Sequence, residues 1–200
     1  METAAIILAA GNSSRMGKPK SLLPWADRPL LEHQLCTLMT CKIDPIIVVL
    51  GRDERNILSA LPHFPGVKFK SNPNPQMGRS HSIKLGVREV SASDSKQVII
   101  VNVDQPLSSV LINRLINAGN QNPNSALVLP KYREAISHPP LIRAHLYDEL
   151  TSLTEDSLGL RRLIDRFKHT AILVDIPDPE IPPHFNTPNE YEAALKNHQK

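Results

Sequence analysis

The sequence has few aromatic residues, no long apolar run and almost no excess of charge. Its apolar runs all stop short of the ~18 to 20 residues that a membrane-spanning helix needs. Its 23 basic residues nearly balance its 20 acidic residues, leaving a net charge of +3, and aromatic residues make up only 4% of the chain. A nucleic-acid footprint would have to be a local basic patch, which the sequence does not show, and unpaired bases would find few rings on which to stack. We therefore expect contact with neither membranes nor nucleic acid, and a small-molecule enzyme is the better hypothesis.

Cysteine is scarce as well. The two cysteines, Cys36 and Cys41, lie in a segment with helical spacing of apolar residues, and their separation is not that of a metal-binding or thioredoxin-like pair. Free cysteine often packs as a small buried hydrophobe, so we predict that both are reduced packing residues. No basic leader precedes the first apolar run, residues 4–10. These features together favour a cytoplasmic location.

Glycine is also sparse, with 8 residues against 18 prolines. The prolines lie mainly at the ends of predicted elements and in three loops, residues 72–75, 131–140 and 176–183. In open α/β sheets the ligand lies beyond the carboxyl ends of the strands, in loops of this kind. These three loops are therefore candidate substrate contacts.

Apolar runs typical of buried strands alternate along the chain with stretches of helical spacing. The predicted strands are residues 4–10, 45–50, 67–70, 97–103, 125–129 and 171–175, and the predicted helices are residues 30–39, 54–60, 80–90, 108–118, 157–167 and 188–196. This alternation indicates βα units and a mostly parallel sheet between two layers of helices. No composition shift, repeat or low-complexity tract divides the 200 residues, so we expect a single domain, residues 1–200.

The loop after the first predicted strand, residues 8–20 with the sequence LAAGNSSRMGKPK, has the composition of an anion-binding site. A triphosphate needs several hydrogen-bond donors together with positive charge, and this segment offers close backbone approach, hydroxyl groups and cations. The contributing residues are Gly11, Ser13, Ser14, Arg15, Gly17, Lys18 and Lys20. From these residues alone, a solvated basic turn is an equal alternative.

Two common phosphate-binding motifs are absent from this loop. Walker A has four residues between its first glycine and its Gly-Lys pair, whereas five separate Gly11 from Gly17, and Pro19 follows Lys18 where Ser or Thr is required. The pattern GxGxxG does not occur either. The loop therefore predicts neither a P-loop NTPase nor a dinucleotide-binding protein of the Rossmann type.

The extended segment LAAGNSSRMGKPKSLLPW, residues 8–25, closely resembles the signature of the MobA-like nucleotidyltransferases, and among them the molybdenum cofactor cytidylyltransferases. Further matching segments follow in family order: NPNPQMGRSHSIKLGV (72–87), VNVDQPL (101–107), SHPPLI (137–142) and FNTPNEYEAAL (185–195). Several motifs in order are far more specific than one. The resemblance spans nearly the whole chain and implies an α/β protein with a three-layer Rossmann-like nucleotidyltransferase fold and a mostly parallel central sheet.

The resemblance also implies a nucleotide site. It places Arg15 against the β and γ phosphates and Lys20 near the α phosphate, where charge builds as pyrophosphate leaves, while Lys18 is expected to be solvated. Ser80 and Ser82, at the start of a predicted helix, would hold the nucleotide or the acceptor, or would simply cap the helix. The implied nucleotide-binding residues are Leu8, Ala9, Ala10, Gly11, Ser13, Ser14, Arg15, Lys20, Ser80 and Ser82.

A metal site is expected around Asp104, which directly follows the predicted strand 97–103. Mg²⁺ prefers one or two carboxylates together with phosphate oxygens and water; a cap of the following helix is the alternative role for this aspartate. The resemblance implies that Asp104 binds the metal and that Asn186 is a second contact. Asn186 stands in HFNTP, where the cytidylyltransferase-like pattern has DIDTP, and a helix cap before Pro188 is the alternative.

An acceptor site is implied by His138 and Pro139, which match the HP of the family's RGHP segment. Ile136 and Ser137 replace the preceding Arg-Gly, which leaves the identity of the acceptor open. Val103 stands where the family's GDQP segment has glycine, which changes how closely a ligand approaches the next residue.

The implied activity is Mg²⁺-dependent transfer of a nucleoside monophosphate from an NTP, with CTP favoured, to the terminal phosphate of molybdopterin or molybdenum cofactor, with release of pyrophosphate. Arg15, Lys20 and Asp104 would be the catalytic residues, and molybdoenzyme maturation proteins are possible partners. The attacking phosphate oxygen is already ionised, so the reaction requires no general base. The alternatives are the same chemistry with GTP or another small phosphorylated acceptor, and a non-catalytic protein that holds the cofactor for a partner enzyme.

Overall fold

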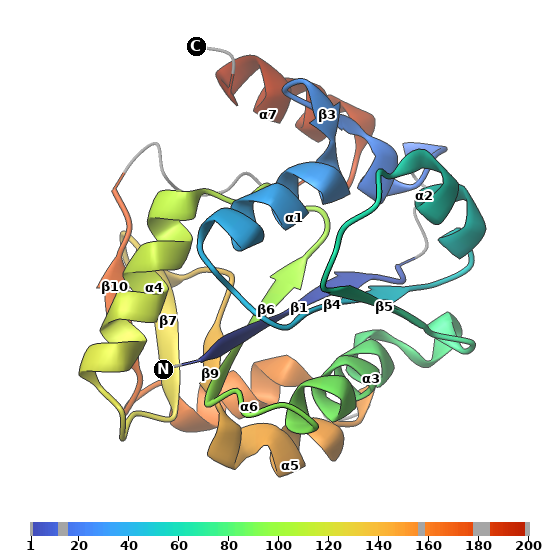
Figure 1. Ribbon diagram of the computed structural model, residues 1–200. Coiled ribbons are helices and arrows are strands. Elements are labelled where there is room, and N and C mark those ends of the chain that lie inside the picture. The colour runs from blue at the N-terminus through green and yellow to red at the C-terminus, as the bar shows by residue number, and fades with distance from the viewer. Residues whose placement is uncertain (1, 12–15, 156–158, 178–184, 199–200) are drawn as a thin grey trace.

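The computed structural model describes residues 2–11, 16–155, 159–177 and 185–198. Within these residues the strands form one large sheet, in the order β10-β7-β9-β6-β1-β4-β5, with β8 paired to β7 (Figure 1). The strands of this sheet are β1 (Thr3–Ala9), β4 (Ile46–Leu50), β5 (Val67–Ser71), β6 (Gln97–Asn102), β7 (Leu127–Tyr132), β8 (Ala135–Ile136), β9 (Leu141–Arg143) and β10 (Ile172–Asp175). A separate antiparallel ribbon consists of β2 (Pro24–Trp25) and β3 (Arg28–Pro29).

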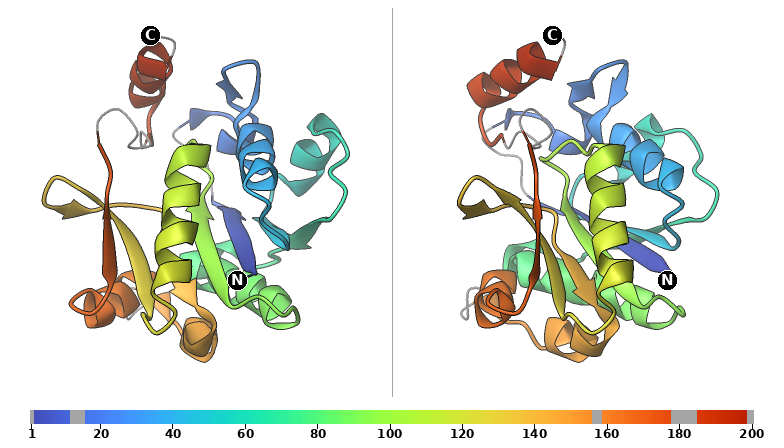
Figure 2. Two further views of the ribbon diagram at one scale, coloured as in Figure 1. Left: turned by 60° about the vertical axis from the view of Figure 1, so that its left-hand side comes forward. Right: turned by 90° about the vertical axis from the view of Figure 1, so that its left-hand side faces the viewer.

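Helices cover both faces of the sheet (Figures 1 and 2). One layer holds α1 (Leu30–Thr40), α2 (Glu54–Ala60) and α4 (Ser109–Gln121), and the other holds α3 (Arg79–Ser91), α5 (Tyr147–Thr151) and α6 (Leu160–Phe167). Short 3₁₀ turns are Lys20–Leu22, Pro75–Met77 and Ala144–Leu146, and the last helix is α7 (Pro188–His198). The expected three-layer α/β architecture is therefore confirmed.

The central strand β1 explains why the core has two halves. All residues of β1 are buried, and all except Thr3 are apolar. The strand is therefore a continuous apolar run rather than an alternation of apolar and polar residues. From Ala4 to Ala9 its odd-numbered residues pack against α1 and α4, and its even-numbered residues pack against α3. Full burial of an isoleucine such as Ile6 contributes about 1.5–3 kcal/mol of stabilisation. The strand thus holds both helical layers to the sheet.

The sheet departs from the expectation at its centre. Strands β1, β4, β5 and β6 run parallel, as predicted, but β9 lies antiparallel between β6 and β7. The predicted strands did not include residues 141–143, because a three-residue strand is too short to display a period. The predicted strand 125–129 is shifted to Leu127–Tyr132, and the predicted helix 157–167 is described from Leu160 onward.

A third apolar cluster lies beyond the carboxyl edge of the sheet and joins segments far apart in the sequence. The ring of Phe185 stacks on Trp25, with centroids 6.0 Å apart, and meets Tyr191 edge-on at 5.3 Å. The Tyr191 hydroxyl donates to the carbonyl of Pro24. These contacts fasten α7 to the β2–β3 ribbon (Figures 1 and 2), an arrangement that sequence patterns did not predict.

The two cysteines are free and only half-buried. The Cys36 sulfur lies 3.4 Å from a guanidinium nitrogen of Arg28, and burial raises the pKa of the Cys41 thiol. Both residues sit on or beside α1, in agreement with the prediction of reduced packing residues. None of the helices in the described ranges is long and apolar enough to cross a membrane.

Candidate active site

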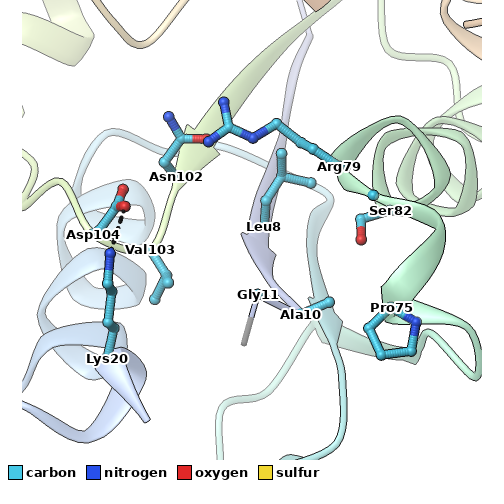
Figure 3. Close-up of a pocket in the computed structure, with 11 residues that line it drawn as sticks. Leu8, Ala10, Gly11, Lys20, Pro75, Arg79, Ser82, Asn102, Val103 and Asp104 are labelled. Atoms are coloured by element: carbon cyan, nitrogen blue, oxygen red, sulfur yellow. Dashed lines mark hydrogen bonds and ion pairs between the residues drawn. The ribbon is translucent and has the colours of Figure 1, made fainter. Parts of the chain in front are cut away.

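A cavity of about 240 Å³ opens at the carboxyl ends of β1 and β6 (Figure 3). Because β1, β4 and β6 are parallel, the loops that follow them meet at the same edge of the sheet. The first turn of α3 forms the opposite wall. The lining residues are Leu8, Ala10, Gly11, Lys20, Pro75, Gly78, Arg79, Ser82, Asn102, Val103 and Asp104.

The ammonium group of Lys20 ties three segments together at the edge of this cavity. Its Nζ donates to Asp104 Oδ2 at 3.0 Å, to Asn186 Oδ1 at 2.8 Å and to the backbone carbonyl of Phe185 at 3.0 Å. An ammonium group has three N–H donors, and these contacts use all of them. The side chains of Lys20 and Asp104 are only 13% and 12% exposed, so water screens their ion pair little. The sequence predicted that these residues share a site, and the structure brings them together.

The position of Asn186 follows from the start of α7. Glu190 Oε2 accepts the N–H groups of Asn186 and Thr187, and the Glu190 N–H donates to Thr187 Oγ1 at 3.4 Å. This reciprocal pattern is a capping box, so Thr187 and Glu190 cap the helix. The Asn186 side chain is directed to Lys20 instead, and the alternative role as helix cap does not apply to it.

Asp104 does not cap a helix either. Helix α4 begins five residues later, and Ser108 holds its N-cap position. Asp104 is buried, and its Oδ2 accepts from Lys20. Val103 is buried beside it and lines the cavity in place of the glycine of the family pattern.

The oxygen atoms around Lys20 fit a hard divalent cation. They comprise the carboxylate of Asp104, the amide oxygen of Asn186 and the carbonyl of Phe185, and they already converge on one positive charge. The described residues contain no cluster of three or more His, Cys, Asp and Glu side chains with metal-binding geometry. This donor set suits an ion that keeps substrate phosphate and water among its ligands, as Mg²⁺ and Mn²⁺ do.

The two serines of α3 face different cavities. Ser82 lines the first cavity, and its Oγ accepts from Asn72 Nδ2 at 2.9 Å. Ser80 lines a second cavity of about 520 Å³. Residues two apart on an α-helix point in nearly opposite directions, because one turn takes 3.6 residues. The structure therefore does not bring Ser80 and Ser82 to one site, although the sequence grouped them.

The amino end of α3 is already occupied by a carboxylate. Glu155 accepts the backbone N–H of Ser80 at 2.9 Å and that of Arg79 at 3.3 Å. Partial burial acts to raise the pKa of Glu155, but hydrogen bonds from Ser80 and Arg79 and the Arg79 charge outweigh burial and lower the pKa. Glu155 is thus ionised at neutral pH, and an incoming anion does not meet bare helix N–H groups.

The remaining predicted residues fall into clear groups. His138 lines the second cavity, next to Ser137, while Pro139 is buried behind it. Leu8, Ala10 and Gly11 line the first cavity, and Ala9 lines a small adjoining cavity of about 110 Å³ with Arg52 and Asp53. Ser13, Ser14 and Arg15 lie outside the described residues.

Arg79 and the carbonyl of Phe185 are site groups that the sequence reasoning missed. Arg79 lay within the matched segment 72–87, directly after Gly78, and a cation at the first position of a helix beside a proline-rich loop was the available signal. The Phe185 carbonyl had no such signal, because a backbone oxygen acquires its position only from the fold.

A cation and converging oxygens beside a cavity at the carboxyl edge of a mostly parallel sheet define an α/β enzyme that handles anionic substrates. Residues 5–171 match the family model of the MobA-like NTP transferase domain. The chain therefore belongs to this family of nucleotidyltransferases, as its motifs indicated.

Individual relatives agree with this assignment. A molybdenum cofactor guanylyltransferase of Xanthomonas euvesicatoria pv. vesicatoria (strain 85-10) is 31% identical over 112 residues, which cover 56% of this chain and 52% of that protein, about half its length. The purine catabolism protein PucB of Bacillus subtilis (strain 168) is 24% identical over 199 residues, 96% of this chain and 95% of PucB.

The fold has been observed in the Rv0371c protein of Mycobacterium tuberculosis H37Rv. That crystal structure superimposes with a TM-score of 0.85 at 22% identity and covers 98% of both chains. A manganese complex of the same protein gives a TM-score of 0.82 at 21% identity, covering 98% of this chain and 99% of that one. At this level of identity, these structures establish the fold alone.

Proposed function

We propose that this nucleotidyltransferase transfers CMP from CTP, in the presence of a divalent metal ion, to the phosphate of a molybdopterin-type acceptor and releases pyrophosphate. The observation that carries the proposal is the cluster of Lys20, Asp104 and Asn186 beside the first cavity. Its groups are those that a phosphate and its metal counter-ion require. The molybdenum cofactor guanylyltransferase among the relatives supports this class of acceptor.

The first cavity is the proposed nucleotide site. A methyl group built on Gly11 would meet no heavy atom of the described residues within 4 Å, which leaves space for a ligand to approach the backbone closely. The small cavity at Arg52 and Asp53 shares Ala10, Gly11 and Pro75 with the first cavity and extends it. We assign the nucleoside to this combined space, with the triphosphate toward Lys20 and the predicted phosphate ligand Arg15.

The transfer step needs alignment and charge neutralisation. An ionised oxygen of the acceptor phosphate attacks the α phosphorus; a new O–P bond forms as the bond to the β-phosphate oxygen breaks, and pyrophosphate leaves with that electron pair. No proton has to be removed from the nucleophile. Lys20 would neutralise the charge that develops at the α phosphate. In phosphoryl transfer, each preorganised cation of this kind lowers the activation free energy by an amount on the order of 3 kcal/mol.

The metal is the second source of positive charge in the proposal. Asp104, Asn186 and the Phe185 carbonyl would hold it, and the manganese complex of Rv0371c supports the use of a divalent ion in this fold. When bound, such an ion supplies Lewis-acid stabilisation of phosphate oxygens. Mg²⁺ is the ion proposed here, because its preference for oxygen ligands and phosphates matches the donor set.

We propose that a single domain, residues 1–200, carries both substrate sites. The match to PucB covers 96% of this chain, which supports treating these residues as one domain. A cytoplasmic location is proposed from the two free cysteines, because disulfides are rare in reducing compartments.

The test is pyrophosphate release by the purified protein with molybdopterin, Mg²⁺ or Mn²⁺, and each of the four common NTPs in turn. We expect turnover with CTP to exceed turnover with GTP by about tenfold, and Asp104→Asn to lower the rate by about 100-fold or more. Faster turnover with GTP than with CTP would contradict the proposed specificity and identify GTP as the substrate, the nucleotide that the name of the guanylyltransferase relative indicates. Nucleotide binding without turnover would reject the enzyme in favour of a cofactor-binding protein.

A further inference from the structure

Arg79 lies between the two cavities. It lines the first cavity together with Lys20 and Asp104, and it lines the second together with His138. In the described part of the chain it is the only residue common to both walls. Figure 3 shows its side chain extending along the wall of the first cavity, past Leu8 and toward Asn102. A charged group in this position reaches ligands in both spaces.

Arg79 forms no ion pair with the residues that the structure describes. Its backbone N–H donates to Glu155, but its guanidinium makes no hydrogen bond and no ion pair within 4 Å to any residue that the structure describes. The charge of Arg79 helps to lower the pKa of Glu155. An exposed guanidinium at the cavity wall keeps its donors available, which suits bidentate binding of a phosphate.

The second cavity has a mixed lining. Arg79, Ser80 and Glu155 line it, and helix α6 contributes two apolar residues, Leu160 and Ile164, and two charged residues, Arg161 and Asp165. Its volume of about 520 Å³ is roughly twice that of the first cavity and within the range of ordinary small-molecule sites. The space is therefore large enough for a ring system attached to a phosphate.

The two carboxylates of this cavity already have hydrogen-bond or ion-pair partners. Glu155 accepts the N–H groups at the start of α3, and Asp165 is paired with Lys168 at 3.0 Å and with Arg161 at 3.8 Å. His138, on the β8–β9 connection, also lines the cavity. Within the described ranges, the positive charge at this cavity that has no ion-pair partner is that of Arg79.

We propose that the second cavity binds the body of the acceptor, a phosphomonoester whose planar ring lies on the α6 wall, and that Arg79 holds its phosphate at the junction of the cavities. This inference rests on the proposed function and adds to it the cavity that holds the acceptor and the residue that binds its phosphate. The phosphate oxygen held there faces the first cavity, from which it attacks the α phosphorus as described above. Arg79 is thus an acceptor-binding residue that positions the nucleophile.

The test uses the whole protein with an α,β-methylene analogue of CTP and Mg²⁺ bound, so that no transfer occurs. Phenyl phosphate serves as the probe, because it combines a phosphate with a flat apolar ring, and inorganic phosphate is the comparison. Protein NMR would follow the Arg79 Nε–H signal and the amides of Ser137 and Leu160. We expect phenyl phosphate to shift all three signals. It should bind about tenfold more tightly than inorganic phosphate, since burial of one ring contributes roughly 1–2 kcal/mol to binding.

The matched variants are Arg79→Met and Arg88→Met. Both arginines are on α3, but Arg88 is exposed near the other end of the helix. Arg79→Met should weaken phenyl phosphate binding by about 10- to 100-fold through loss of a charge-assisted contact, and Arg79→Lys should recover part of the loss. Arg88→Met should leave the affinities for phenyl phosphate and for the CTP analogue within about twofold of the wild type.

The outcomes separate this inference from the proposed function. An unchanged Arg79 signal in the wild type, or undiminished phenyl phosphate binding in Arg79→Met, would overturn the assignment of the second cavity while leaving nucleotidyl transfer intact. Failure of the wild type to bind any CTP analogue would instead reject the proposed nucleotide site. The wild-type signals suffice for the decision even where a variant is unstable.

Discussion

Lys20 lies at the centre of the candidate site, because its ammonium group occupies the point where the proposed metal ligands converge. Asp104 and Asn186 come from distant parts of the chain, and Lys20 satisfies an oxygen of each. Without a positive charge there, the buried carboxylate would lose its counter-charge, which is unfavourable in a poorly solvated site. Lys20 and a divalent ion therefore compete for the same oxygens.

Replacement of Lys20 by methionine should affect catalysis and metal binding in opposite directions. We expect the rate of nucleotidyl transfer to fall by about 100- to 1000-fold, because a phosphate-binding charge is lost. Binding of Mn²⁺ without nucleotide, followed by electron paramagnetic resonance, should tighten by about tenfold as the competing ammonium is removed. Lys18→Met, at an exposed position of the same loop, is the control. Weaker Mn²⁺ binding in Lys20→Met would contradict the competition.

Glu155 provides a test at acid pH. Its pKa in the folded protein is lowered from 4.5, so the group stabilises the fold above that value and loses this effect as pH falls through the folded-state pKa. Glu155→Gln should therefore reduce the free energy of unfolding at about pH 7 by roughly 0.5–1 kcal/mol, a modest value because the side chain is exposed. Urea unfolding at about pH 3 should show little difference from the wild type. An equal difference at both pH values would exclude the carboxylate charge as the cause.

At the scale of elements, the ribbon β2–β3 and helix α7 act as one support for the site. Phe185 is fully buried between Trp25 and Tyr191, and its backbone carbonyl, together with the next residue, reaches Lys20. Ring packing on one side of the chain thus fixes oxygen positions on the other. The helix itself adds a capping box that holds the backbone of Asn186 in place.

Phe185→Ala should disturb this support and the site together. We expect a loss of about 3–5 kcal/mol in the free energy of unfolding, as for other large buried aromatic residues, and a loss of activity as two of the three acceptors of Lys20 become mobile. Urea unfolding and pyrophosphate release measure the two effects. Leu58→Ala, at a 40% exposed position on α2, is the control and should change neither strongly. Full activity in folded Phe185→Ala would show that α7 does not position the site.

At the scale of the whole molecule, the antiparallel strand β9 divides the sheet, and Arg143 on it holds three segments together. Arg143 is 3% exposed, and its guanidinium donates to Gln97 Oε1 at 2.6 Å, to the carbonyl of Asn122 at 3.0 Å and to that of Gly119. Burial lowers the pKa of this arginine. The contacts lie at the amino end of β6, at the opposite edge of the sheet from the site.

Arg143→Met should therefore reduce stability without changing the chemistry. Loss of the donors leaves buried acceptors unsatisfied, and we expect the free energy of unfolding to fall by about 1–3 kcal/mol per uncompensated group, with limited additivity. The KM for CTP and the kcat of the folded fraction should stay within about twofold of the wild type. Urea unfolding and steady-state kinetics test this, and an altered KM would show that the two edges of the sheet are coupled.

Much of the fold could be predicted from particular runs of residues. The continuous apolar run of β1 and the helical spacing in α1 and α3 reflect local burial on two faces or one, so each carries its own signal. Strand β9 and the β2–β3 ribbon carry none, because two or three residues cannot display a period. Their place depends on neighbours such as β6 and β7 that are distant in sequence.

For the site, the sequence alone determined the class of chemistry and led us to propose several of its residues. Lys20, Asp104 and Asn186 could be proposed because they stand in motifs that resemble those of the MobA-like family. The tertiary structure alone decided that Lys20 bonds to both of the others, that Ser80 and Ser82 face different cavities, and that Arg79 joins those cavities. Residue identity limits what a group can bind, whereas direction and distance arise only when helices and strands pack around a common core.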